Sequence, residues 1–165
     1  MEKQQKAGFL LDYSINKQSH LFHVKAVNRP IRQEEMRFFI PSNKATAVLN
    51  GEPERQIGNV HFLCNQKNRN FQLVFFPFGP DNSPQIRRLG GEKLAAEIEL
   101  LASRRLKEKV GGTILDLMPE TTRGWRYLRK TGRGFIRRFI WGGFKQTMPL
   151  SISIGHLEKF IREKK

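Results

Sequence analysis

Cysteine is almost absent from this sequence, since Cys64 is the only one among 165 residues. The chain therefore cannot form an internal disulfide, which indicates a reducing compartment. Cys64 lies in the apolar stretch "NVHFLCN" and is interpreted as a small core residue rather than a reactive thiol. There is no CxxC pair, and His20 and His23 fall on opposite faces of an expected strand. The sequence therefore predicts no metal site.

Long apolar runs are also missing. No segment reaches the roughly 18 apolar residues that a membrane-spanning helix needs. The N-terminal stretch "MEKQQKAGFLLDYS" contains no apolar run of the length expected for a signal peptide. These two absences predict a soluble, cytoplasmic protein with no membrane partner.

Acidic residues are scarce relative to basic ones. Fifteen Asp and Glu oppose 30 Lys and Arg, so the formal net charge is +15 and the isoelectric point is ≈ 10.5. A surface of this charge attracts polyanions, so the expected partner is a nucleic acid, an acidic lipid or a phosphate-rich ligand. Hydrophobic residues still make up 38% of the chain, which is typical of a globular domain rather than a disordered chain.

Short apolar runs separated by turn residues predict most of the secondary structure. Residues 31–40 fit either a short helix or a strand, and residues 156–165 fit a C-terminal helix or tail. Strands are expected at residues 8–15, 20–27, 71–78, 113–119, 134–144 and 147–154, with two more within 45–65 around Asn50, Gly51 and Pro53.

Two internal helices are expected. Apolar residues recur at helical spacing over residues 92–109, and Gly111 follows as a C-terminal stop. Thr121 or Thr122 is suited to cap a second helix that Gly132 ends. The order predicts an α/β (α+β) fold, a single domain over residues 1–165 with a mixed, mostly antiparallel sheet flanked by helices. The strands at 71–78 and 113–119 should be parallel across the long helix.

Two segments suggest a family. "QIRRLGGEKL" stands between the strand at 71–78 and the long helix, and "LDLMPETTRGWRYLRKTGRGF" follows that helix. In this order and at this separation they resemble the GNAT acetyltransferase superfamily. In that family a strand leads into a Gln/Arg-x-x-Gly-x-Gly/Ala loop and a long helix. The loop's N–H groups and the helix N-terminus there hold the pyrophosphate of acetyl-CoA.

The resemblance covers roughly residues 45–155 and implies a GNAT-like fold with acetyl-CoA as the cofactor. Glu92 stands where one frame of the loop motif has Gly or Ala, and Leu128 stands where the family's Tyr falls, with Tyr127 beside it. The cofactor-binding residues that the resemblance implies are Phe75, Phe76, Arg87, Arg88, Leu89, Gly90 and Gly91.

Acyl transfer to an amine needs a base for the amine and a proton donor for the leaving group. Tyr127 is the candidate acid and His61 the candidate base. Glu54 and Asp116 are alternative bases, because they lie on or next to central strands. His61 alternates with apolar neighbours, so a strand-surface position without a catalytic role is the competing interpretation.

A basic tract occupies residues 123–138, with seven Lys or Arg, no acid and interleaved aromatic residues. Arginine and aromatic side chains can contact phosphates and stack on bases. A solvated helix face with inward aromatics is the alternative. The candidate nucleic-acid-binding residues are Arg123, Arg126, Arg129, Lys130, Arg133, Arg137 and Arg138.

Two functions follow from these patterns. One is a GNAT-like acyltransferase that uses acetyl-CoA, acting on or near a nucleic acid or other polyanionic partner. The other is a non-catalytic, basic nucleic-acid-binding protein on a degenerate GNAT-like scaffold.

Overall fold

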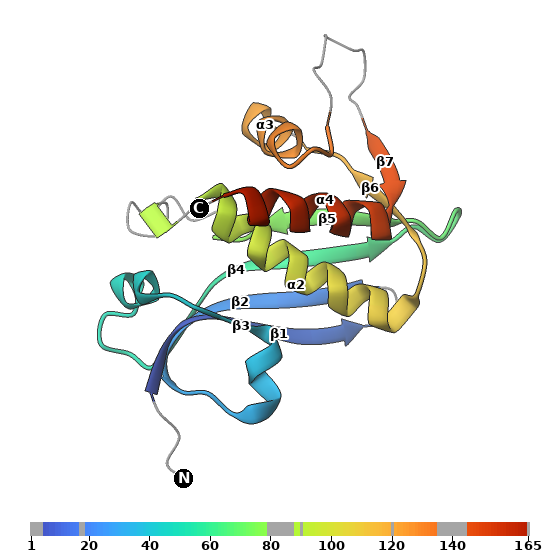
Figure 1. Ribbon diagram of the computed structural model, residues 1–165. Helices are drawn as coiled ribbons and strands as arrows, with labels where there is room; N and C mark the ends of the chain where they lie inside the picture. Colours follow the sequence, from blue (N-terminus) through green and yellow to red (C-terminus); the bar gives the residue numbers. More distant parts are fainter. Residues whose placement is uncertain are drawn as a thin grey trace.

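Seven strands of the described chain form one mixed sheet in the order β3-β1-β2-β4-β5-β6-β7 (Figure 1). The computed structural model describes residues 5–16, 19–78, 88–89, 91–119, 121–134 and 145–164. The strands are β1 (Gln5–Asn16), β2 (Ser19–Pro30), β3 (Phe39–Pro41), β4 (Glu54–Cys64), β5 (Phe71–Phe76), β6 (Ile114–Leu117) and β7 (Gln146–Pro149). The helices are α2 (Glu92–Val110), α3 (Thr122–Lys130) and α4 (Leu150–Glu163), with short 3-10 helices η1 (Gln33–Phe38) and η2 (Asn43–Val48).

The sheet confirms the predicted mixed, mostly antiparallel arrangement. β1 and β2 pair antiparallel over their full length, as expected for two strands joined by a polar turn. β5 and β6 are parallel, and α2 connects them, which confirms the predicted crossover. The described elements share one sheet and one main core, so the chain forms a single mixed α/β domain.

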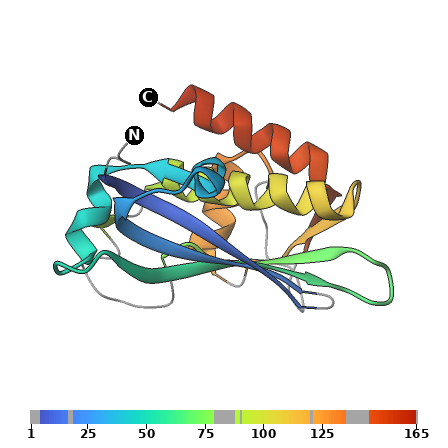
Figure 2. The same cartoon turned by 90° about the horizontal axis from the view of Figure 1, so that it is seen from below.

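The main core lies between the sheet and two helices. Figure 2 shows α2 and α4 on the same side of the sheet. Alternate strand residues such as Phe22 and Phe62 point toward these helices, since successive side chains face opposite sides of a strand. Ile98 and Leu106 of α2 and Leu157 of α4 belong to the same core cluster, and all five are fully buried. A smaller second cluster contains Leu10, Val27, Ile31 and Phe39.

The long helix α2 confirms the helix predicted at residues 92–109. Its apolar residues form the stripe that faces the sheet, as the spacing predicts. Gly111 ends it with φ +74°, a conformation that favours glycine, and its N–H donates to the Lys107 carbonyl at 2.8 Å. The helix thereby ends four residues before β6 begins at Ile114.

The C-terminal region corrects one prediction. The strand expected at residues 147–154 ends at Pro149, and α4 begins at Leu150 rather than at residue 156. Leu150, Ile154 and Leu157 recur at helical spacing and are buried, which overrides the β-preference of the isoleucines. The predicted C-terminal helix is therefore real but longer.

Residues 43–48 correct a second secondary-structure prediction. The first of the two strands expected within residues 45–65 is instead the 3-10 helix η2, while the second is β4. The Ser42 side chain accepts a hydrogen bond from the Lys44 N–H at 3.2 Å and caps η2. Ala45 and Val48 are buried in the main core, so packing selects the helical turn.

Some predictions fall outside the described part of the chain. The strand expected at residues 134–144 lies almost wholly within undescribed residues. The segment at 31–40, which fitted a helix or a strand, supplies both, as η1 and β3. Among the described residues no helix is long and apolar enough to cross a membrane.

Candidate functional site

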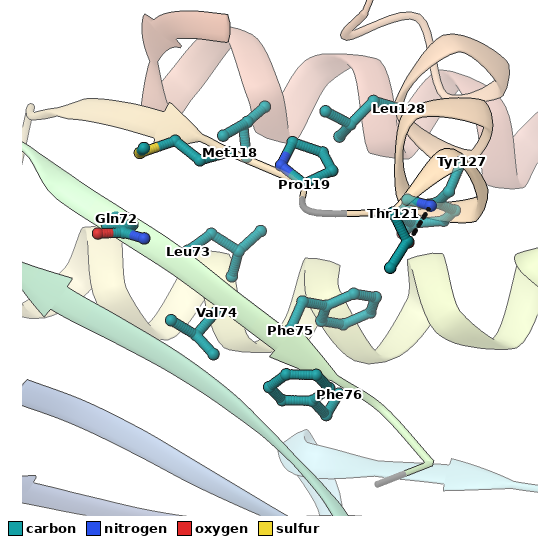
Figure 3. A pocket seen from close by; sticks show the side chains of 12 residues that line it. Gln72, Leu73, Val74, Phe75, Phe76, Met118, Pro119, Thr121, Tyr127 and Leu128 are labelled. Carbon is teal, nitrogen blue, oxygen red and sulfur yellow. Dashed lines mark hydrogen bonds between the residues drawn. The ribbon is translucent and has the colours of Figure 1, made fainter. Parts of the chain in front are cut away.

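An apolar cleft opens where the parallel strands β5 and β6 part. The two strands pair from Phe71 with Leu115 to Leu73 with Leu117, and β5 then continues to Phe76 without β6. Figure 3 shows side chains of β5 facing Pro119 and residues of α3 across this opening. The cleft has a volume of ≈ 230 Å³ and is lined by Gln72, Leu73, Val74, Phe75, Phe76, Leu117, Met118, Pro119, Thr121, Gly124, Tyr127 and Leu128.

The parting of the strands also leaves backbone groups without a strand partner. Residues 74–76 pair with β4 on one side. On the β6 side, no described strand pairs with them. An unpaired strand edge presents N–H and C=O groups that can bind another extended chain. The cleft therefore combines apolar walls with hydrogen-bonding groups along one edge.

The α3 wall of the cleft is held in place by its N-terminal cap and by ring stacking. The Thr121 side chain accepts a hydrogen bond from the Gly124 N–H at 3.0 Å, which confirms the predicted cap. The rings of Phe75 and Tyr127 stack with centroids 5.7 Å apart and an interplanar angle of 16°. These two residues, one predicted for the cofactor and one for catalysis, therefore lie in contact.

The Tyr127 hydroxyl points into the core rather than into the cleft. It donates to Glu99 Oε1 at 2.9 Å. Burial, together with the negative charge of Glu99, raises the pKa of Tyr127 well above its usual value. The phenol proton is thus engaged by a buried carboxylate, and the ring supplies the cleft wall.

A buried ion pair lies behind Tyr127. Arg133 donates to both oxygens of Glu99, with the Nη2–Oε1 distance at 2.9 Å, and both side chains are fully buried. Arg133 also donates to Ser153 Oγ at 3.1 Å on α4 and to Thr131 Oγ1 at 3.0 Å. Paired and fully hydrogen-bonded charges are the form in which ions persist inside proteins. The network joins α2, α3 and α4 behind the cleft.

This ion pair makes Arg133 a buried structural residue rather than a nucleic-acid-binding one. It also shows that Glu99, which was not predicted, has a structural role behind the cleft. Arg133 is 1% exposed and bound to a carboxylate, so it does not offer its guanidinium to a polyanion. Sequence reasoning missed Glu99, although its position between Ile98 and Leu100 on the apolar side of α2 was a signal. An acid on a helix face that packs in the core needs a buried partner.

His61 lies on the face of the sheet that points away from α2 and α4. It is the register partner of Val74, a cleft residue, while its neighbours Val60 and Phe62 point into the core. The His61 Nε2 lies 2.5 Å from Ser19 Oγ, and burial lowers the pKa of His61 below 6.5. The imidazole is therefore neutral near pH 7. It is not one of the residues that line the cleft, and it lies on the opposite face of the sheet from Tyr127. The two predicted catalytic residues are not brought together.

The two alternative bases have different surroundings. Asp116 is 3% exposed and accepts hydrogen bonds from Asn70 Nδ2 and Thr147 Oγ1, each at 3.2 Å. It is the register partner of the cleft residue Gln72. Glu54 lies at the start of β4 and binds Lys25 and Arg29, each within 3.2 Å. Asp116 is therefore near the cleft, and Glu54 belongs to a separate ion-pair cluster.

The N-terminus of α2 stands beside the cleft's α3 wall. Gly91 is its N-cap and has no side chain with which to cap the first-turn N–H groups. Lys130 Nζ of α3 lies 2.8 Å from Glu92 Oε1 and neutralises the acid at this helix end. Arg88 is exposed and Leu89 is buried. The predicted residues Arg87 and Gly90 lie outside the described residues.

The described residues of the basic tract differ in their exposure to solvent. Arg137 and Arg138 fall outside the described part of the chain, and Arg133 is in the core. The remaining members are exposed on α3: Arg123, Arg126, Arg129 and Lys130. Within the described ranges, no group of three or more His, Cys, Asp or Glu side chains is arranged to hold a metal ion.

Comparison of the chain with protein-family models, with curated proteins and with solved structures found no match.

Proposed function

We propose that this protein is an acyltransferase that binds an acyl-CoA in the cleft between β5 and β6. The observation that carries the proposal is the parting of these parallel strands after Leu73 and Leu117. It leaves an apolar cleft along a backbone edge that pairs with no described strand, which suits the narrow, amide-containing pantetheine arm of CoA. The predicted cofactor residues Phe75 and Phe76 both line this cleft.

The phosphate groups of CoA would lie at the N-terminus of α2. The first-turn N–H groups of a helix favour an anion, and Gly91 places no side chain over them. Glu92 would repel a pyrophosphate, but Lys130 neutralises it at 2.8 Å. The exposed Arg88 adds a cation next to this end.

Bound acyl-CoA supplies an acyl group activated as a thioester. On this chain, His61 is the group best suited to take the proton of an acceptor amine, because it is neutral near pH 7 and is the register partner of the cleft residue Val74. We assign Tyr127 to the cleft wall, since its proton is donated to Glu99. The backbone edge of residues 74–76 would orient the pantetheine arm and keep water from it.

Thermal unfolding in the presence of acetyl-CoA tests the proposal. A ligand at about 100 times its dissociation constant stabilises the folded state by about 2.7 kcal/mol. Met118→Trp should fill the cleft and abolish this stabilisation. Met36→Trp is the matched control, because Met36 and Met118 are similarly exposed, at 40% and 44%, and Met36 lies outside the cleft. No stabilisation by acetyl-CoA at millimolar concentration would refute the proposal.

A further inference from the structure

Helix α3 has two faces of opposite character. Gly124, Tyr127 and Leu128 line the cleft at helical spacing. The opposite side carries the exposed residues of the helix, which are Thr122 and four long basic side chains. The exposed basic residues of α3 are Arg123, Arg126, Arg129 and Lys130.

Three of these cations have no counterion. In the part of the chain that the structure describes, no carboxylate lies within ion-pair distance of Arg123, Arg126 or Arg129. Elsewhere the described carboxylates are mostly engaged, for example Glu35 by Arg29 and Glu158 by Arg104. Like charges at three-residue spacing repel each other along a helix. Arg123, Arg126 and Arg129 therefore form no ion pair with the described protein, and their charges suit an external anion.

The exposed basic residues of α3 extend far enough along the helix to reach more than one phosphate of a nucleic-acid backbone. Residues 123 and 130 are separated by about 10 Å along the helix axis at 1.5 Å per residue. This length corresponds to about three phosphates of one strand, at about 3.4 Å each along a duplex. Arginine guanidinium groups bind phosphate oxygens with two hydrogen bonds, which favours them over lysine for this contact. The net charge of +15 would attract such a polymer from a distance.

A lipid surface fits this helix less well. A helix that lies in a membrane interface buries large apolar residues in the lipid. On α3 the large apolar residues Trp125, Tyr127 and Leu128 instead pack in or against the main core. We propose that the exposed face of α3 binds the sugar–phosphate backbone of a nucleic acid, through contacts that do not depend on base sequence. This binding surface does not rest on the proposed acyltransferase activity.

Fluorescence anisotropy with a labelled DNA duplex of about 20 base pairs tests this at about 50 to 200 mM salt. The variant R123Q/R126Q/R129Q should flatten the slope of log K against log salt by about 2 to 3 and weaken binding at least about tenfold. The matched control is K6Q/K44Q/K67Q, which removes the same charge from exposed lysines on β1, η2 and the β4–β5 turn. It should bind much more tightly than the α3 variant.

Three results would overturn the proposal: no binding by the wild type at low salt, equal losses in the two variants, or α3-dependent binding to phosphatidylserine vesicles in preference to DNA. Circular dichroism should show both variants folded, since all six residues are exposed. Acetyl-CoA affinity measured on the α3 variant should equal that of the wild type. A failure of nucleic-acid binding is thus distinguishable from a failure of the proposed acyltransferase function.

Discussion

Lys130 Nζ lies 2.8 Å from Glu92 Oε1 and joins the last turn of α3 to the first turn of α2. Both side chains are partly exposed, so the pair adds little to stability. Its main effect is to neutralise the charge of Glu92. This acid stands where one frame of the loop motif has Gly or Ala.

The first prediction concerns this pair. Lys130→Met should weaken acetyl-CoA binding roughly two- to fivefold, because an unpaired carboxylate would then face the phosphates. Adding Glu92→Gln to that variant should restore the affinity, measured by isothermal titration calorimetry. Arg104→Met is the control, since it breaks the similarly exposed pair between Arg104 and Glu158 on another surface. Equal affinities in the wild type and the Lys130 variant would contradict the assignment of this helix end.

The second prediction concerns the buried ion pair. Glu99→Gln should lower the free energy of unfolding by about 3 to 5 kcal/mol, because Arg133 would remain buried without a counterion. Glu97→Gln is the control on the same helix: burial raises the pKa of Glu97, so loss of its charge should cost little. Urea denaturation measures both. Similar losses in the two variants would show that the pair has no special role.

The third prediction separates two roles of Tyr127. Tyr127→Phe removes the hydrogen bond to Glu99 and should cost about 1 to 2 kcal/mol of stability. It retains the ring that stacks on Phe75, so acetyl-CoA affinity should not change. Acetyl transfer, once an acceptor amine is known, should fall by less than about tenfold, whereas loss of a proton donor typically costs 10²–10⁴-fold. A loss in that larger range would return Tyr127 to a catalytic role.

The fourth prediction is a pH dependence of stability. His20 is 7% exposed, its Nδ1 lies 2.5 Å from the Tyr13 hydroxyl, and its ring meets Phe71 edge-on. Burial, and to a lesser extent the charge of Lys109, holds the pKa of His20 below 6.5. The unfolded state therefore binds a proton first as the pH falls. Unfolding free energy should decrease from about pH 7 down through the folded-state pKa.

Urea midpoints at about pH 7.5 and about pH 5 measure this effect. His20→Gln should lose less stability over this interval than the wild type. Part of the loss should remain, because burial also lowers the pKa of His61. His156→Gln controls for removal of a histidine elsewhere. An unchanged pH dependence in the His20 variant would rule out this origin.

The fifth prediction concerns the contact between β4 and the end of β5. A Cβ atom on Gly58 would lie 2.4 Å from the Phe76 carbonyl oxygen and 2.5 Å from that of Pro77, both backbone atoms. Gly58→Ala should therefore destabilise by about 1 to 3 kcal/mol. Gly112→Ala meets no atom within 4 Å and should change stability little. Thermal unfolding distinguishes them, since 1 kcal/mol shifts Tm by about 2–4 °C in a chain of this size. Equal Tm values would mean that the backbone near Phe76 adjusts freely.

Apolar periodicity alone was sufficient to predict those elements whose apolar pattern fits only one type of secondary structure. The apolar spacing over residues 92–109 predicted α2, and the strong runs on either side predicted β5 and β6 as its parallel partners. Thr121 or Thr122 was predicted to cap α3, because a threonine before a helical pattern has a defined hydrogen-bonding role, and Thr121 is the cap in the structure. These features depend on neighbours within a few residues, so the sequence contains them.

Other elements depended on distant contacts. Residues 150–154 read as a β-branched strand, and they became part of α4 because Leu150 and Ile154 are buried in the main core that α2 also lines. Ala45 and Val48 likewise joined the core from a 3-10 helix. A short segment with weak local preference takes the conformation that buries its apolar side chains, and that choice requires the rest of the fold.

The sequence by itself determined the charge, the crossover between β5 and β6 and the basic character of α3. Only the tertiary structure decided which basic residues face solvent. Arg133 and Arg129 are chemically equivalent in the sequence, but Arg133 lies behind α3, where Glu99 meets it from α2. The cleft is also a tertiary feature, because it exists where two strands stop pairing and a helix packs across the opening. Partners more than 30 positions apart in the chain leave no local pattern from which their pairing could be predicted.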